Sequence, residues 1–207
     1  MAKTSLQLTP KKIPIQTRSK ATVEVILQAT AHILESGGLA ILTTNLIAER
    51  AGVSVGSVYQ YFPSKEAILI ELVRRMRQDL CEDLEEARDS IRGLGLREAV
   101  EKMVRASAAH HIRAPRRVEV LEYAELELPM TTEIEALKRR SLSAVLFVLD
   151  RYDIIDAPTA AFDLSAMCKG VIGAQAQIGC KDFEPVIRRL TDAVCGYLLG
   201  APDERNS

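Results

Sequence analysis

The chain has 207 residues, of which 47% are hydrophobic and 27% charged, and its formal net charge is −1. This length allows one large domain or two small ones with a real core, and the composition is that of an ordinary globular protein. No stretch approaches the roughly 18 uninterrupted apolar residues of a membrane-spanning helix, and the first residues lack the apolar segment of a secretory signal. We therefore expect a cytoplasmic protein without a membrane segment.

The composition favours an all-α fold. Helix formers such as Ala, Leu, Glu and Arg dominate, only eight prolines and eleven glycines interrupt them, and no alternating Val/Ile/Thr run suggests a strand. The four cysteines lack the C-x-x-C spacing of zinc and redox sites. We expect Cys81, Cys168, Cys180 and Cys195 to be small buried hydrophobes in a reducing compartment.

The N-terminal part begins with a basic, aperiodic arm and continues with four predicted helices. The predicted segments are an arm over 1–17 and helices over 18–36, 43–51, 54–61 and 65 into the 80s. The hydroxyls of Thr43 or Thr44, Ser54 and Ser64 can each accept an N–H group of the first turn that follows them. Gly52 allows a sharp turn between the second and third helices, so that these two form a candidate helix-turn-helix.

Apolar residues at helical spacing predict five more helices in the rest of the chain. Their expected ranges are 96–112, 116–127, 131–150, 158–179 and 183–199. Pro115 and Pro129 mark two of the breaks, because the residue before a proline is biased away from the helical conformation. Nine helices joined by short connections are expected in total.

Three of the nine aromatic residues lie within four positions, at Tyr59, Tyr61 and Phe62. Phe62 is a plausible core residue. Tyr59 and Tyr61 lie about 200° apart around a helix, so one core cannot easily absorb both. At least one tyrosine should therefore face solvent or a partner.

A polyanion is the partner that the charges favour. Residues 1–66 carry seven basic and four acidic side chains, a balance of +3, which leaves −4 for the remainder. A tyrosine hydroxyl can bind a phosphate, and Lys65 and Thr44 stand at helix N-termini, where the dipole favours an anion. Gly56 lets the third helix approach a groove closely.

The block LTTNLIAERAGVSVGSVYQYFPSKEAIL, residues 42–69, resembles the DNA-binding signature of TetR-family transcriptional regulators. The resemblance implies a helix-turn-helix DNA-binding domain over 18–66 and a helical ligand-binding and dimerisation domain over 67–207. It also implies phosphate contacts from Thr44, Tyr59, Tyr61 and Lys65, and base contacts from Asn45, Val55, Gly56 and Ser57. Because Val55 and Gly56 offer no side-chain donor, Asn45 and Gln60 are the best candidates for bidentate contacts to adenine.

The larger domain should hold the dimer interface and the pocket. A smooth or apolar stripe on each of the last two helices suits a dimer interface: Ala166, Gly170, Ala174, Val186, Leu190, Ala193 and Tyr197. Residues on helices that usually line the family's pocket are Met103, His110, Tyr123, Phe147 and Met167. His110 and His111 are adjacent, so their side chains should diverge by about 100°, and we expect no metal site and no cofactor.

These features favour a regulator that binds a double-stranded palindromic operator as a homodimer and is released by a small molecule, most often as a repressor. Two alternatives remain. An all-α enzyme would need a nucleophile–base pair or a metal cluster, and no such signature is visible. A helical adaptor would bind a protein through the N-terminal surface, and its binding would lack the steep salt dependence of a DNA complex.

Overall fold

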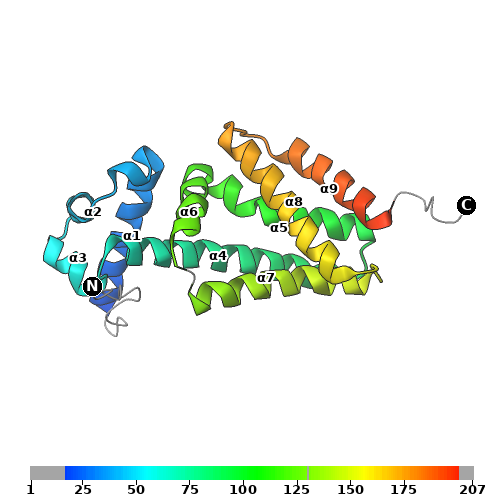
Figure 1. Ribbon diagram of the computed structural model, residues 1–207, viewed down its shortest axis with the longest axis horizontal. Helices are drawn as coiled ribbons and strands as arrows, with labels where there is room; N and C mark the ends of the chain where they lie inside the picture. Colours follow the sequence, from blue (N-terminus) through cyan, green and yellow to red (C-terminus); the bar gives the residue numbers. More distant parts are fainter. Residues whose placement is uncertain (1–16, 130, 201–207) are drawn as a thin grey trace, which may run out of the picture. The chain divides into compact units, whose positions relative to one another are not determined.

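The computed structural model describes residues 17–129 and 131–200, and all regular structure in these ranges is helical (Figure 1). The elements are α1 (Thr17–Gly37), the 3-10 turn η1 (Leu39–Ile41), α2 (Thr44–Ala51), α3 (Val55–Tyr61), α4 (Lys65–Asp89), α5 (Leu96–Arg113), α6 (Pro115–Glu127), α7 (Thr132–Arg151), α8 (Ala157–Gln177) and α9 (Glu184–Leu199). The predicted all-α class and its nine α-helices are confirmed within the described residues. Residues 1–16 of the predicted arm lie outside them.

The predicted caps fix where the helices start. Thr43, rather than Thr44, accepts the Leu46 N–H ahead of α2 over 3.2 Å, and the Ser54 hydroxyl accepts the Ser57 N–H ahead of α3 over 3.0 Å. The Ser64 hydroxyl likewise accepts a first-turn N–H group at the start of α4. Each cap satisfies a first-turn donor that has no partner inside the helix. The short turn η1 was not predicted, since three residues give no readable periodicity.

The described chain divides into two units. The first contains residues 17–75 and 116–129, and the second contains residues 76–115 and 131–200. Helix α4 therefore begins in the first unit and ends in the second, and α6 belongs to the first. The division expected from sequence, between residues 66 and 67, would instead assign nearly all of α4 and the whole of α6 to the larger domain.

In the first unit, α1 packs against α2 and α2 against α3. Leu34, Ile47, Val58 and Phe62 are at most 1% exposed and form the core of this small bundle. Arg75 on α4 forms an ion pair with Glu24 on α1, with 2.7 Å between Nη1 and Oε2. A second charged partner, Glu71, lies one turn earlier on α4, 2.9 Å from Arg75 Nε.

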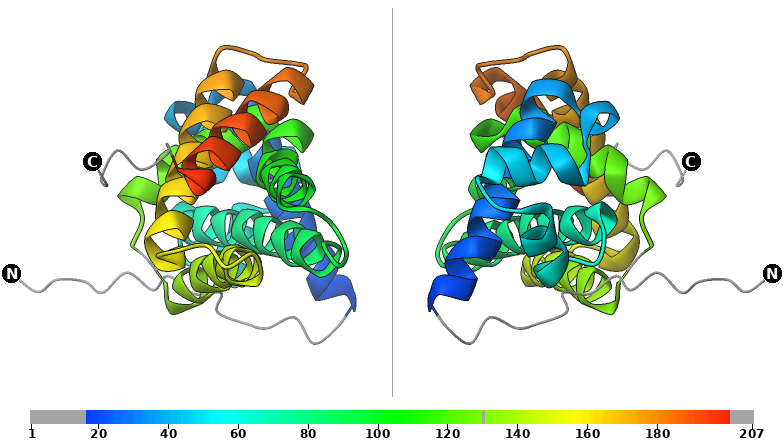
Figure 2. Two further views of the ribbon diagram at one scale, coloured as in Figure 1. Left: turned by 90° about the vertical axis from the view of Figure 1, so that its right-hand side faces the viewer. Right: turned by 90° about the vertical axis from the view of Figure 1, so that its left-hand side faces the viewer.

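In the second unit, α5 packs against α8 and α9, and α7 packs against α8. Figure 2 shows α8 and α9 side by side. Buried aliphatic side chains fill the space between these helices, among them Val104, Leu164, Ile187 and Val194. No helix within the described residues is both long enough and apolar enough to cross a membrane. All four cysteines are free; three are buried and Cys180 is half-buried, a partial departure from the expected burial.

Candidate nucleic-acid interface and ligand pocket

The turn between α2 and α3 depends on Gly52. Its φ of 65° and ψ of 30° lie in the left-handed region, which glycine adopts without steric cost. The Gly52 N–H donates to the Glu49 carbonyl over 3.1 Å, and the Val53 N–H donates to the Ala48 carbonyl over 3.0 Å. These bonds close α2 and redirect the chain into α3, which gives the helix-turn-helix that the sequence predicted.

The three clustered aromatic residues take three different environments. Phe62 is 1% exposed and belongs to the core, as expected, whereas Tyr59 is 46% exposed. Tyr61 is half-buried, and its hydroxyl lies 3.4 Å from the Ser19 hydroxyl of α1. Tyr59 is thus the aromatic side chain of α3 that is most available to a partner.

Gly56 has no packing reason to be a glycine. It is exposed on α3, and a Cβ built there would meet only the Ser54 hydroxyl oxygen, at an ordinary 3.7 Å. A glycine in a helix costs about 0.5–1 kcal/mol relative to alanine. The packing of the fold therefore does not explain why position 56 lacks a side chain. The missing side chain leaves the backbone of α3 open to close approach by a partner.

The other predicted contacts lie around α3 and at the ends of its neighbours. Asn45 and Gln60 are exposed, and Thr44 is half-buried. The Lys65 ammonium donates to the carbonyl of Leu42, just before the α2 cap, over 3.2 Å. An ammonium has three donors, so this bond leaves two for another acceptor.

None of the nine predicted contact residues is buried. Val55 and Ser57 are half-buried, and the Ser57 hydroxyl lies 2.8 Å from the Ser54 hydroxyl. The Ser57 hydroxyl therefore already takes part in one hydrogen bond at the N-terminus of α3, either as donor or as acceptor. The surface presents amides, hydroxyls, one ammonium and bare backbone, which are groups that bind phosphates and base edges.

The second unit contains an apolar pocket among α5, α7, α8 and α9, with a volume of about 50 Å³. Of the twelve residues that line it, nine are aliphatic or methionine, and Met103 is among them. The other three are Ser107, Ser165 and Cys168. Burial raises the pKa of the Cys168 thiol to about 11, so this thiol is neutral at pH 7.

Of the five residues predicted to line the ligand pocket, Met103 is the one that lines this apolar pocket. Met167 is half-buried and packs beside the core, and Phe147 is 53% exposed with the Arg88 guanidinium 5.8 Å from its ring centroid. Tyr123 lies on α6, in the other unit, and is 62% exposed. The five residues were chosen because they lie on helices that usually line the family's pocket, and a helix as a whole does not say which of its residues border a void.

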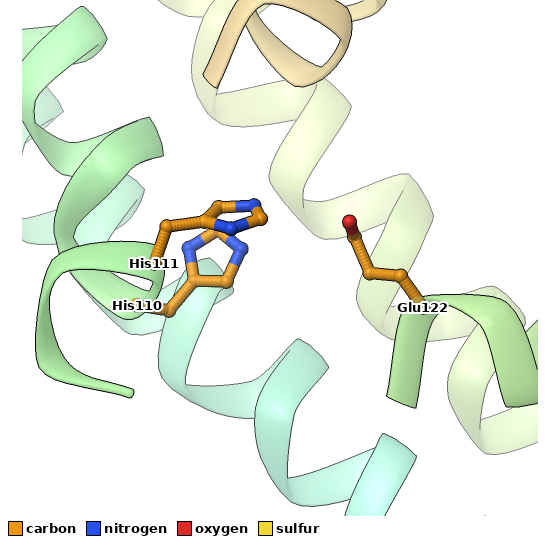
Figure 3. A group of neighbouring side chains, drawn as sticks. All are labelled: His110, His111 and Glu122. Carbon is orange, nitrogen blue, oxygen red and sulfur yellow. The ribbon is translucent and has the colours of Figure 1, made fainter. Parts of the chain in front are cut away.

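His110 lies apart from this pocket, near the C-terminal end of α5. Its ring and that of His111 pack together, with centroids 4.4 Å apart (Figure 3). The expected divergence of adjacent side chains is thus reduced by rotation of the side chains toward each other. Glu122, also labelled in Figure 3, belongs to α6 and to the other unit. That no metal binds remains a prediction.

The His110 ring is 6% exposed, and neither of its nitrogens has a hydrogen-bond partner among the described residues. Burial, and to a smaller extent the positive charges of His111, Arg77, Arg113 and Lys169, together lower its pKa to about 3. The imidazole is therefore neutral at pH 7.

The predicted dimer stripe needs one correction. Ala166, Gly170 and Ala174 on α8 are exposed, as are Ala193 and Tyr197 on α9. Val186 and Leu190 are each 2% exposed and belong to the core of their own unit. Of the predicted residues on α9, only Ala193 and Tyr197 are therefore open to a second copy.

Residues 26–72 match the sequence model of the bacterial regulatory proteins of the tetR family. The helix-turn-helix region of this chain is similar to that of the tetR family. The match runs from the middle of α1, through α2 and α3, into the first turns of α4, and it contains all nine predicted contact residues.

Two curated relatives align with the same region. The nucleoid occlusion factor SlmA of Vibrio vulnificus is 45% identical over 65 residues, which cover 31% of this chain and 29% of SlmA. The transcriptional repressor KstR of Mycolicibacterium smegmatis is 44% identical over 50 residues, which cover 24% of each chain. The chain thus spans under a third of the length of these relatives.

The TetR-like fold continues beyond that region. The chain is similar to the transcriptional regulator FadR of Bacillus subtilis, solved in complex with stearoyl-CoA, with a TM-score of 0.68 and 17% identity. The similarity covers 83% of this chain and 96% of FadR. The arrangement of helices is therefore shared, and at 17% identity the similarity shows the fold alone.

The helix-turn-helix region also contains an interaction that the sequence did not suggest, the bond from Lys65 to the Leu42 carbonyl. A lysine before an apolar run gives no indication of a partner 23 positions earlier. The pocket residues of α9, such as Val194 and Leu198, were also missed, because their helix was interpreted only as a dimer element.

Proposed function

We propose that this protein is a ligand-responsive transcriptional regulator, a repressor that binds a palindromic double-stranded DNA operator as a homodimer. A small molecule bound in the second unit releases it from DNA. The exposed backbone of α3 at Gly56 carries the proposal, because the fold itself does not require a glycine there. Tyr59 beside it and Lys65 at the start of α4 supply phosphate contacts on the same region.

The base-contacting surface is short of strong side-chain donors. Asn45 and Gln60 are its exposed amides, and each can form two hydrogen bonds with an adenine in the major groove. Val55 is suited to contact with a thymine methyl group. We therefore propose A·T-rich half-sites, with part of the specificity coming from the shape of the DNA.

The homodimer is proposed to form through the exposed faces of α8 and α9. Ala166, Gly170, Ala174 and Ala193 present small side chains along these two adjacent helices, which allows helices of a second copy to approach closely. Two heads related by a two-fold axis would contact half-sites about 34 Å apart, one turn of the duplex.

The first experiment is selection of duplexes from a random library by the purified full-length chain. We expect an enriched inverted repeat, and we expect Tyr59→Ala combined with Gly56→Glu to lose it. Tyr123→Ala is the matched control, because it removes another exposed tyrosine outside the helix-turn-helix. Enrichment without an inverted repeat would contradict the dimeric operator.

The salt dependence of binding separates this proposal from the adaptor alternative. Each phosphate contact that is neutralised lowers the slope of log K against log salt by about 0.9. Binding to DNA that does not weaken from 50 to 200 mM salt would argue against a phosphate interface. Failure to bind DNA, with turnover of a small molecule, would favour the enzyme alternative.

A further inference from the structure

A group of charged side chains lies on α4 near the point where this helix leaves the first unit. The Arg74 guanidinium donates two hydrogen bonds to the Glu71 carboxylate, from Nε to Oε2 over 2.8 Å and from Nη2 to Oε1 over 3.0 Å. Arg75 donates from Nε to Glu71 Oε1 over 2.9 Å. The two arginines stand three and four positions after the glutamate, so one stretch of α4 brings the three side chains together.

The Glu71 carboxylate is the centre of this group. Its side chain is 16% exposed, and burial by itself would raise its pKa. The hydrogen bonds from Arg74 and Arg75 outweigh burial and lower the pKa below its ordinary value. Glu71 is therefore ionised at pH 7, and its charge-assisted bond to Nε restricts the position of the Arg75 guanidinium.

Arg75 extends the group to α1. Its Nη1 donates to both oxygens of Glu24, over 2.9 Å to Oε1 and over 2.7 Å to Oε2. Arginine can bind two carboxylates at once through separate N–H groups of one rigid plane, whereas lysine has a single ammonium on a flexible stem. Arg75 is also the last residue of α4 that belongs to the first unit. It therefore fixes α1 to α4 just before α4 continues into the second unit.

Helix α1 connects this contact to the candidate DNA-binding surface. It packs against α2, α2 packs against α3, and the Ser19 hydroxyl of α1 lies 3.4 Å from the Tyr61 hydroxyl at the end of α3. Glu24 follows Ser19 by five positions on the same helix. At the start of α4, Lys65 binds the Leu42 carbonyl ahead of α2. Two polar contacts roughly 15 Å apart along α4 thus hold the helix-turn-helix bundle on this helix.

The contact between Arg75 and Glu24 contributes to geometry more than to stability. The two side chains are 36% and 45% exposed, and ion pairs with such exposure contribute little to the free energy of unfolding. Removal of the Glu24 charge would leave Arg75 bound to Glu71, so no charge would lose its only partner. A variant at Glu24 is therefore expected to fold, with α1 held less firmly on α4.

We propose that Arg75 is a positioning residue for DNA binding, which through Glu24 sets the angle at which the helix-turn-helix is held on α4. This role rests on the proposed dimeric regulator, because the angle decides how two heads meet half-sites about 34 Å apart. One base pair more or less between the half-sites moves one of them by roughly 3.4 Å and turns it by roughly a tenth of a turn. Two firmly held heads tolerate this change poorly, whereas two loosely held heads tolerate it well.

The spacing of the half-sites tests this role in the full-length protein. Two duplexes are derived from the operator that selection enriches, with the half-sites one base pair closer together or one base pair further apart. Binding of each duplex is measured by fluorescence anisotropy. The unmodified protein should bind both at least tenfold more weakly than the operator, whereas Glu24→Gln should lose less than threefold on either. An equal loss in the two proteins would overturn the proposal.

Two further variants separate geometry from charge. Glu35→Gln is the matched control, because it removes the same charge from α1 and breaks a different ion pair, in which Arg117 Nη1 lies 3.5 Å from Glu35 Oε1. It should keep the full tenfold loss. Arg75→Lys keeps the charge but not the planar guanidinium, and it should tolerate the altered spacing as Glu24→Gln does. Tolerance in Glu35→Gln, or a full loss in Arg75→Lys, would refute the role of the Arg75 geometry.

Urea denaturation of the same variants excludes a general loss of folding. Glu24→Gln and Glu35→Gln should unfold at the same urea concentration. Earlier unfolding of Glu24→Gln, with an unchanged loss of binding on the altered duplexes, would make the contact structural only.

The two proposals fail in different ways. An unmodified protein that selects no inverted repeat would refute the dimeric regulator, and the role of Arg75 with it. A selected inverted repeat whose spacing dependence does not change in Glu24→Gln would refute the role of Arg75 alone.

Discussion

The Lys65 ammonium donates a hydrogen bond to the Leu42 carbonyl over 3.2 Å and so links the first residue of α4 to the chain that enters α2. This lysine was predicted only as a phosphate contact. The structure adds a second role, because the bond holds the N-terminus of α2 beside that of α4. Two roles at one residue predict that stability and DNA affinity change together when the charge is removed.

Lys65→Met should therefore lower both quantities. Loss of a hydrogen bond from a charged donor at a partly buried site costs about 1 kcal/mol of unfolding free energy, measured by urea denaturation. Loss of one phosphate contact should reduce the magnitude of the salt slope of operator binding by about 1. Lys65→Arg keeps the charge and its donors and should retain most of both. A lower stability with an unchanged salt slope would make Lys65 structural only.

Gly56→Ala should move stability and affinity in opposite directions. The new Cβ meets only the Ser54 oxygen at 3.7 Å, and replacing a helical glycine by alanine gains about 0.4–1 kcal/mol through the unfolded state. The same methyl group should weaken operator binding at least tenfold if the α3 backbone lies against DNA. Gly52→Ala is the contrasting control, because its φ of 65° makes any side chain strained and destabilising. A more stable variant with unchanged affinity would remove Gly56 from the interface.

The helix boundaries were predictable because their determinants are local. Ser54 and Ser64 cap the helices that follow them, and Gly52 makes the turn through a conformation that few other residues adopt. Such features depend on hydroxyls and glycines within three or four positions of the helix end, so a single sequence displays them.

In the candidate sites, the burial of a residue was predictable only where it depends on a single helix. Phe62 is buried, as expected, and Tyr59 is exposed. Phe62 is the extended residue that ends α3, so its side chain leaves the helix where the chain turns. By contrast, Val186 and Leu190 form an apolar stripe that fits a dimer interface or an internal core equally well, and the packing of α5 on α9 decides for the core. The pocket is a void between four helices, and the spacing of apolar residues along one helix does not predict such a void.

Gly170→Glu should break the proposed homodimer without harming the monomer. Gly170 is exposed on α8, and a Cβ there would have no neighbour within 4 Å, so the new side chain fits the isolated subunit. In a close helix interface the buried carboxylates would repel each other and lose hydration. Analytical ultracentrifugation should show a shift from dimer to monomer and at least a tenfold increase in the dissociation constant. Ser143→Glu adds the same charge at an exposed position of α7 and should leave the dimer intact. Dissociation of both variants would show that the added net charge, and not the position of Gly170, breaks the dimer.

The buried His110 should make the protein less stable in mild acid. Its folded pKa of about 3 lies below the ordinary value near 6.5, so between these pH values the unfolded chain binds a proton that the folded chain does not. The stability is therefore complete above about pH 6.5 and is lost progressively as the pH falls toward 3. At pH 5, about 1.5 units below the ordinary value, the loss of unfolding free energy is about 2 kcal/mol at 1.36 kcal/mol per unit.

His110→Leu should remove this loss, so that the unfolding free energies measured by urea denaturation at pH 8 and at pH 5 differ less than in the unmodified protein. Leu164→Met, an uncharged change in the same unit, should shift both measurements equally; the same pH dependence in His110→Leu as in the unmodified protein would show that another group is responsible.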